Sequence, residues 1–221
     1  MAITPTTLTR GAAVAAVVAG LLFIGIQIGH PHLDAGSITS TEVQIRGSLK
    51  VLMAVLALVG ITGMYLSQVR RNGVLGLIGF LVLGAAYLLI TCMTYLAAFV
   101  LPQLATVDAA YVDNVIDVVV GRATTGDVGL FAMAVQVQNF SFLAGGLIFG
   151  IALYRARVLA RWATALLAVG GVVTILLSVL PDAFYRLLAF PNGIAMIGLG
   201  VSLWLTSRSN REPASELVGA E

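Results

Sequence analysis

Six long runs of apolar residues restrict what this chain can fold into. They cover residues 11–29, 48–66, 74–101, 129–154, 163–180 and 183–206. A helix needs about 20 apolar residues to cross the hydrocarbon core of a bilayer, and each run approaches or exceeds that length. The runs are continuously apolar, whereas transmembrane strands alternate, so the runs predict helices. We therefore expect an all-α, polytopic membrane protein with a single six-helix transmembrane domain over 1–206.

The scarcity of charge supports the same class of protein. Only 10% of the 221 residues are charged and the mean hydropathy is +1.02, whereas soluble domains carry about 25% charged residues. The net charge is +2 and no segment is polybasic, which argues against a nucleic-acid partner. The lipid bilayer is the expected partner.

The positions of Lys and Arg predict the orientation of the chain across the membrane. With the N-terminus in the cytoplasm, 8 of the 12 basic residues fall inside: Arg10, Arg70, Arg71, Arg155, Arg157, Arg161, Arg208 and Arg211. The 4 that fall outside are Arg46, Lys50, Arg122 and Arg186. We expect a cell-membrane protein with both termini cytoplasmic and a polar, disordered tail over 207–221.

The segment 105–120 predicts a short helix outside the membrane. The apolar residues at helical spacing are Val107, Tyr111, Val115, Ile116 and Val119, and the acidic residues opposing them are Asp108, Asp113 and Asp117. This pattern is typical of an amphipathic surface helix. It would either close the outer end of the bundle or cover a pocket there.

Polar residues inside the bilayer are costly, so they carry most of the functional information. They gather in the outer half of the predicted spans: Lys50, Tyr87, Thr91, Tyr95, Gln136, Asn139, Arg186 and Asn192. One interpretation is an outward-facing polar pocket in which Lys50 and Arg186 hold an anionic group. The other is hydrogen bonding between helices, with both cations reaching the outer head groups.

The sixth span contains a helix-breaking sequence. Phe190, Pro191, Asn192 and Gly193 follow one another inside an apolar run. Proline removes a helical hydrogen bond and glycine loosens the next turn, so we expect a kink or break at Pro191. Broken helices line binding sites in transporters, whereas an ordinary kink has no such role.

His30-x-His32-x-Asp34 is a weak candidate metal site, because imidazole and carboxylate are zinc ligands. A proton-handling role and a solvated loop are the alternatives. No fourth ligand can be identified, so we predict neither a metal nor a cofactor. No nucleophile–base pair is evident, and no catalytic residue is assigned.

Glycines at close spacing recur in three of the spans: Gly146-x-x-x-Gly150, Gly73/Gly76/Gly79 and Gly193/Gly198/Gly200. Such spacing lets helix backbones approach closely. The glycines could serve the internal packing of the bundle or a homodimer.

The second half of the chain carries a recognisable pattern. Residues 153–162 read Leu-Tyr-Arg-Ala-Arg-Val-Leu-Ala-Arg-Trp, a glycine-rich helix and Pro191 follow, and the last helix ends Leu203-Trp204-Leu205. Over residues 130–206 the chain resembles the uncharacterised domain-of-unknown-function 4386 family of bacterial multipass membrane proteins. Ala160 stands where that family usually has proline, and no acidic residue follows Pro191. The family has no established activity, so the resemblance implies architecture only.

Three functions fit these observations. The first is binding of a small or lipid-like ligand in the outer pocket. The second is a small transporter or channel subunit, against which the apolar inner half argues. The third is an interfacial lipid-modifying enzyme that uses His30, His32 and Asp34, which ranks last because no nucleophile–base pair accompanies them.

Overall fold

The computed structural model describes residues 4–177 and 189–209, and over that part the regular secondary structure is entirely helical, without strands. The long helices are α1 (Pro5–Gly25), α2 (Thr41–Leu66), α3 (Val69–Tyr95), α6 (Leu130–Ala156), α7 (Arg161–Leu177) and α9 (Ala189–Ser209). The short ones are the 3-10 helix η1 (Ser37–Thr39), the π-helix η2 (Leu96–Val100), α4 (Leu101–Leu104) and α5 (Ala109–Val120). The predicted all-α class is confirmed.

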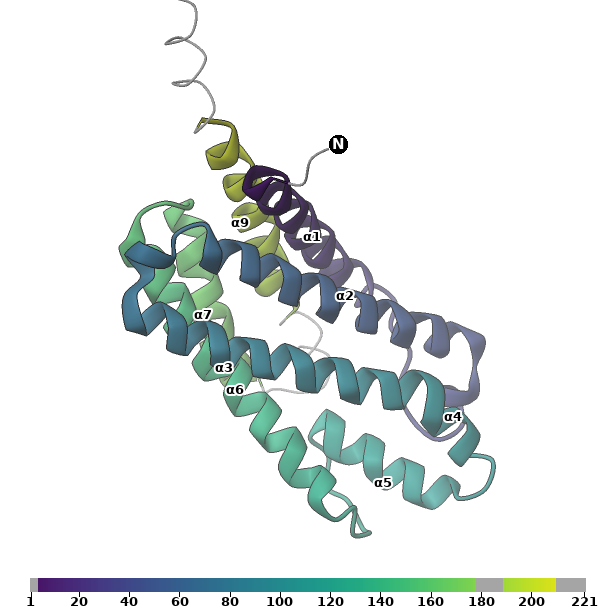
Figure 1. Ribbon diagram of the computed structural model, residues 1–221. Coiled ribbons are helices and arrows are strands. Elements are labelled where there is room, and N and C mark those ends of the chain that lie inside the picture. The colour runs from purple at the N-terminus through teal and green to yellow at the C-terminus, as the bar shows by residue number, and fades with distance from the viewer. Residues whose placement is uncertain (1–3, 178–188, 210–221) are drawn as a thin grey trace, which may run out of the picture.

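The long helices form a closed ring in which each packs chiefly against two neighbours (Figure 1). The order around the ring is α1, α2, α3, α6, α7 and α9, and α9 returns to α1. Small side chains such as Ala16 and Ala57 and larger ones such as Phe149 and Leu199 are fully buried in the core. The first and last helices of the described chain are therefore neighbours.

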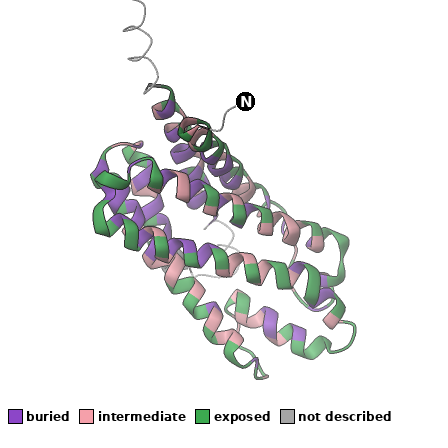
Figure 2. Cartoon of the chain, viewed as in Figure 1, coloured by how far each residue is buried: buried purple, intermediate pink, exposed green. Residues whose placement is uncertain are grey.

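The outer surface of the ring is apolar, as lipid contact requires. Figure 2 shows that exposed residues recur along the long helices. Large side chains such as Leu21, Leu81 and Leu205 are each more than half exposed. Within residues 4–177 and 189–209, five helical segments are long and apolar enough to cross a membrane: α1, α2, α3 with its extension to Leu104, α6 and α9. These features fit an integral membrane protein. The 17 residues of α7, which contains most of the fifth predicted run, cover about 26 Å, so a sixth membrane-spanning helix stays a prediction.

The first two helices begin before the apolar runs that they contain, because capping residues precede each run. The Thr4 side chain accepts a hydrogen bond from the Thr7 N–H, and α1 starts at residue 5 rather than 11. The Ser40 side chain accepts from the Val43 N–H, and α2 starts at residue 41, as the Ser40-Thr41-Glu42 sequence indicates, ahead of the apolar run at 48. Side-chain oxygens at these positions satisfy N–H groups that lack helical partners.

Later bounds also differ from the predicted ones. The third span begins at Val69, because a first turn precedes a kink at Gly73, whose φ is 57°. The last helix is described from Ala189 and ends at Ser209, beyond the predicted 206, and Pro191 lies within it. Residues 178–188 and 210–221 lie outside the described chain, so the break at Pro191 and the disordered tail stay predictions.

Glycines bring neighbouring helices into backbone contact. A Cβ atom at Gly145 would lie 2.4 Å from the Leu83 nitrogen, between α6 and α3. At the α1–α9 contact, a Cβ on Gly20 would lie 2.4 Å from the Gly193 carbonyl oxygen. These glycines pack inside one chain, and the homodimer through glycine-rich faces stays a prediction.

The charges gather at two opposite ends of the bundle. Arg10 Nε donates to Ser207 Oγ at 3.4 Å, which joins the start of α1 to the end of α9. The α2–α3 and α6–α7 turns lie at the same end in Figure 1, which we call the arginine-rich end. The opposite end, which we call the α5 end, holds α5 and the loop between α1 and α2, with Asp34 and Asp117. The orientation of these ends across the bilayer stays a prediction.

Candidate functional site

Helix α5 covers the α5 end of the bundle. The Asp108 carboxylate accepts from the Tyr111 N–H at 2.9 Å and starts the helix within the predicted segment 105–120. The buried face of α5 carries Val112, Val115 and Ile116, which pack against side chains from η1, α2, α4 and the start of α6. Val107, which was expected on the apolar face, precedes the helix and is 83% exposed.

The loop between α1 and α2 crosses this end along a fixed path. Arg46 of α2 donates to the carbonyl oxygens of Ile26 at 2.8 Å and Ile28 at 3.0 Å. Arg122, just after α5, donates to the Leu33 carbonyl oxygen at 2.8 Å. The Asp113 carboxylate accepts from the Ala35 N–H at 2.7 Å. The loop is therefore tied to α2 on one side and to the α5 region on the other.

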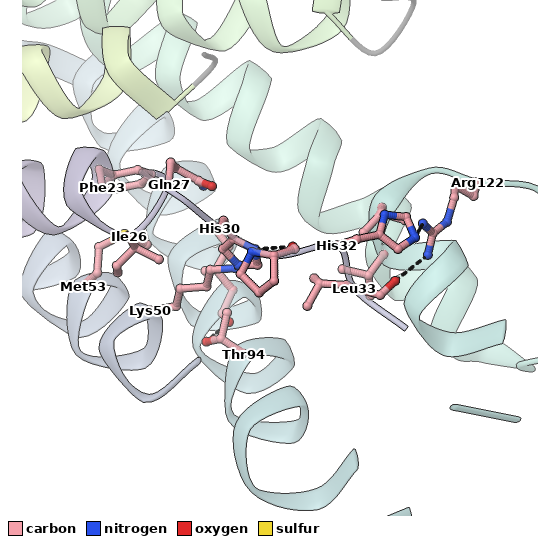
Figure 3. Close-up of a pocket in the computed structure, with 14 residues that line it drawn as sticks. Phe23, Ile26, Gln27, His30, His32, Leu33, Lys50, Met53, Thr94 and Arg122 are labelled. Atoms are coloured by element: carbon pink, nitrogen blue, oxygen red, sulfur yellow. Dashed lines mark hydrogen bonds between the residues drawn. The ribbon is translucent and has the colours of Figure 1, made fainter. Parts of the chain in front are cut away.

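Two adjoining cavities lie beneath this loop. The first, of about 270 Å³, has polar groups in its wall (Figure 3): Gln27, His30, His32, Lys50, Thr94 and Arg122. The second, of about 330 Å³, is lined mainly by apolar side chains of α3, η2, α4 and α5. His30, Lys50 and Thr94 line both. We call the first, whose wall combines these polar groups with apolar side chains such as Phe23 and Met53, the polar chamber, and the second the apolar chamber.

Lys50, the only lysine in the chain, stands in that shared wall. Its Nζ lies 2.9 Å from His30 Nε2, and His30 Nδ1 lies 2.9 Å from the Pro31 carbonyl oxygen. A carbonyl oxygen only accepts and an ammonium only donates, so this geometry assigns the proton to Nδ1 and the lone pair to Nε2. A neutral imidazole therefore accepts from Lys50 and orients it.

The second histidine is held in a parallel way. Arg122 Nη1 lies 2.9 Å from His32 Nε2, while Arg122 Nε pairs with Asp117 Oδ1 at 2.7 Å. Asp34 instead accepts from the Ser37 N–H at 2.6 Å. The three residues of the His-x-His-x-Asp sequence thus have three separate partners. No group of three or more potential ligands that could hold a metal occurs in the described ranges.

Asp34 gives this loop a dependence on pH. The Ser37 N–H bond lowers the pKa of the carboxyl below 3.8, so the charged form stabilises the folded state at neutral pH. That contribution is present above the unfolded pKa and is lost as the pH falls through the lower folded value. We expect Asp34→Asn to remove this contribution. The free energy of unfolding at pH 7 should fall by less than about 1 kcal/mol, because solvent screens the exposed carboxylate. Unfolding of both proteins between pH 7 and pH 2 tests this, and a larger difference at pH 2 than at pH 7 would contradict it.

The residues predicted on the third span do not meet in a pocket. Tyr87 is buried, with Phe23 and Phe142 against its ring at centroid distances of 6.5 and 5.7 Å. Thr91 Oγ1 donates to the Tyr87 carbonyl oxygen within the same helix. Tyr95 is 53% exposed.

The predicted residues on the later spans are also separate from the cavities. Gln136 and Asn139 are exposed on α6, whereas their neighbour Gln138 lines the apolar cavity. Asn192 is 4% exposed, and its Oδ1 faces Gly170 of α7. Arg186 lies outside the described residues. Of the predicted binding residues that the structure describes, Lys50 alone lines the two cavities.

The sequence interpretation assigned no binding role to Gln27, Thr94 or Arg122. Gln27 and Thr94 are polar residues near the outer ends of apolar runs, which is a signal that could have found them. Arg122 reaches the cavity through a pairing with His32 that spans 90 positions, and no local pattern predicts it.

No protein-family model, curated protein or solved structure matches this chain. The resemblance to the domain-of-unknown-function 4386 family stays a prediction.

Proposed function

We propose that this membrane protein binds an anionic, single-chain amphiphile at the α5 end. The observation that carries the proposal is the position of Lys50 in the wall common to a polar and an apolar cavity. A molecule with a charged head and an apolar chain has the two properties that these adjoining chambers offer. The proposed ligand therefore combines an anionic head group with one alkyl chain.

The polar chamber supports recognition of an anion. Carboxylate, sulfate and phosphate oxygens accept strong, charge-assisted hydrogen bonds from an ammonium group. His30 holds the Lys50 ammonium in place through a bond of 2.9 Å. Arg122 adds a second positive charge at the same cavity, although its pairing with Asp117 reduces its effect.

The apolar chamber supports a single chain rather than two. Ligand pockets generally enclose about 300–1,000 Å³, and the apolar chamber, at about 330 Å³, is at the small end of that range. Its walls include Leu101, Val115, Ile116 and Phe131. Burial of each methylene there contributes about 0.8 kcal/mol, so affinity should rise with chain length until the chamber is full.

Ligands that share a chain and differ in head group test this proposal. Dodecanoate, dodecanol and dodecylamine would be offered to the purified full-length protein in mild detergent, and binding read by native mass spectrometry. We expect dodecanoate to bind at least about tenfold more tightly than dodecanol, because Lys50 adds a charge-assisted hydrogen bond. Dodecylamine should bind most weakly. Equal binding of all three would refute an anion-selective site.

Filling the apolar chamber should shorten the chain that it accepts. Ala97 lines this chamber, and Ala97→Phe would occupy space that an alkyl chain needs. We expect about tenfold weaker dodecanoate binding and little change for hexanoate, measured in the same assay. Ala110→Phe, at an exposed position on α5 outside both chambers, is the matched control. If dodecanoate and hexanoate lost affinity equally, the alkyl chain would not lie in the apolar chamber.

A further inference from the structure

A third cavity, of about 410 Å³, lies at the arginine-rich end, away from the α5 chambers. Its wall comes from the α2–α3 turn, the α6–α7 turn and the end of α9, and includes Ser67, Gln68, Arg70, Arg71, Val158 and Thr206. It shares no lining residue with the two α5-end chambers. Any ligand here is independent of the proposed function.

Two arginines give this cavity a strong positive charge. Arg70 and Arg71 are consecutive, exposed and in the first turn of α3. The ion pairs within residues 4–177 and 189–209 are Arg46–Glu42 and Arg122–Asp117, so neither of these arginines is neutralised there. Guanidinium groups bind phosphate oxygens through paired N–H bonds.

Gln68 lines the same cavity and carries a buried acceptor. The residue is 4% exposed, and its Nε2 donates to the Met64 carbonyl oxygen at 3.2 Å. Its Oε1 is buried and has no hydrogen-bond partner in the described part of the chain. Buried polar atoms are almost always hydrogen-bonded, so a donor from a ligand would complete this group.

We infer that this cavity binds a phosphate diester head group that carries a hydroxyl, as in phosphatidylglycerol. The phosphate would accept from Arg70 and Arg71, and the hydroxyl would donate to Gln68 Oε1. Basic pockets between transmembrane helices attract anionic lipid head groups at the membrane surface. A soluble glycerol phosphate offers the same two groups, and the experiments below separate the two sources.

The arginines are tested by lipid competition. Full-length protein in mild detergent would be offered equal amounts of phosphatidylglycerol and phosphatidylcholine with the same acyl chains, and retained lipid identified by native mass spectrometry. We expect at least tenfold preference for phosphatidylglycerol, lost in Arg70→Gln/Arg71→Gln. Arg155→Gln, an exposed arginine at the same end that does not line the cavity, should keep it. An unchanged preference in the double variant would overturn the inference.

Gln68 is tested with a head group that lacks the hydroxyl. Wild type should prefer phosphatidylglycerol over phosphatidylmethanol about tenfold, and Gln68→Met should bind the two equally. Asn72 provides a matched control, because it is a buried amide without a partner on the same turn but does not line the cavity. Asn72→Leu should keep the preference. Loss of preference in both variants would indicate general disruption of the turn and overturn the role of Gln68.

Competition with glycerol 3-phosphate distinguishes a lipid head group from a soluble phosphate as the ligand. If the head group of a bilayer lipid is the occupant, millimolar glycerol 3-phosphate should leave phosphatidylglycerol bound. Displacement of the lipid from the wild type, together with loss of glycerol 3-phosphate binding in Arg70→Gln/Arg71→Gln, would support the same chemistry with a soluble phosphate as the ligand. Binding of glycerol 3-phosphate that persists in the double variant would overturn the site.

Discussion

Replacing Gly79 with alanine should disrupt the bundle, whereas the same change at Gly84 in the same helix should be tolerated. A Cβ on Gly79 would lie 2.5 Å from the Phe149 nitrogen and 2.7 Å from its Cα, so backbone of α6 blocks it. A Cβ on Gly84 would meet only Leu58 Cδ1, at an ordinary 3.6 Å. The two variants make the same chemical change on α3, so their difference reports the α3–α6 contact.

The expected sizes of these effects follow from general packing energetics. Overpacking a core costs about 1–3 kcal/mol when side chains can adjust, and backbone cannot move aside as easily, so Gly79→Ala should lose at least about 3 kcal/mol. Gly84→Ala should gain about 0.5–1 kcal/mol, because alanine favours a helix over glycine. Thermal unfolding in detergent, followed by near-ultraviolet circular dichroism, measures both. Similar stability of the two variants would contradict the close α3–α6 approach.

The second large effect is expected from Lys50→Met, which removes the charge and keeps most of the apolar side chain. Loss of a charge-assisted hydrogen bond of about 1.5–3 kcal/mol corresponds to roughly 10- to 100-fold weaker binding of dodecanoate. Dodecanol affinity should stay within about threefold, because its chain contacts are unchanged. Native mass spectrometry with both ligands gives the two affinities from one protein sample.

Binding of dodecanol also shows whether the cavity is intact in the Lys50→Met variant. If dodecanol binds normally and dodecanoate does not, the loss belongs to the charge. Arg155→Met serves as the control for removal of a distant positive charge, because Arg155 is exposed at the opposite end of the bundle. Wild-type dodecanoate binding in Lys50→Met would rule out the ammonium as the anion-binding group.

The sequence predicts the class of fold well because apolar runs of membrane length have few alternatives. Helix ends are harder to predict, because they depend on single capping groups, such as Thr4, that lie in polar segments.

The candidate site is only partly predictable for a different reason. Helices that face lipid are apolar on every side, so hydropathy does not indicate how a helix is rotated within the bundle. Gln136 and Asn139 were therefore expected at a pocket, whereas the structure exposes them and places Gln138 in a cavity wall. Lys50 was predicted because a lysine in an apolar run is conspicuous. Its partner His30 comes from a loop whose path depends on long-range bonds from Arg46 and Arg122.

The pairing of α1 with α9 has a consequence for biosynthesis. Arg10 and Ser207, which join these helices, are 197 positions apart. At 5–20 residues per second, a ribosome needs about 10–40 s to make the intervening chain. During that time the face of α1 that contains Gly20 has no α9 to pack against. The nascent protein must therefore hold its first helix in an incomplete assembly until translation has almost ended, and a chain terminated before residue 189 can never complete the ring.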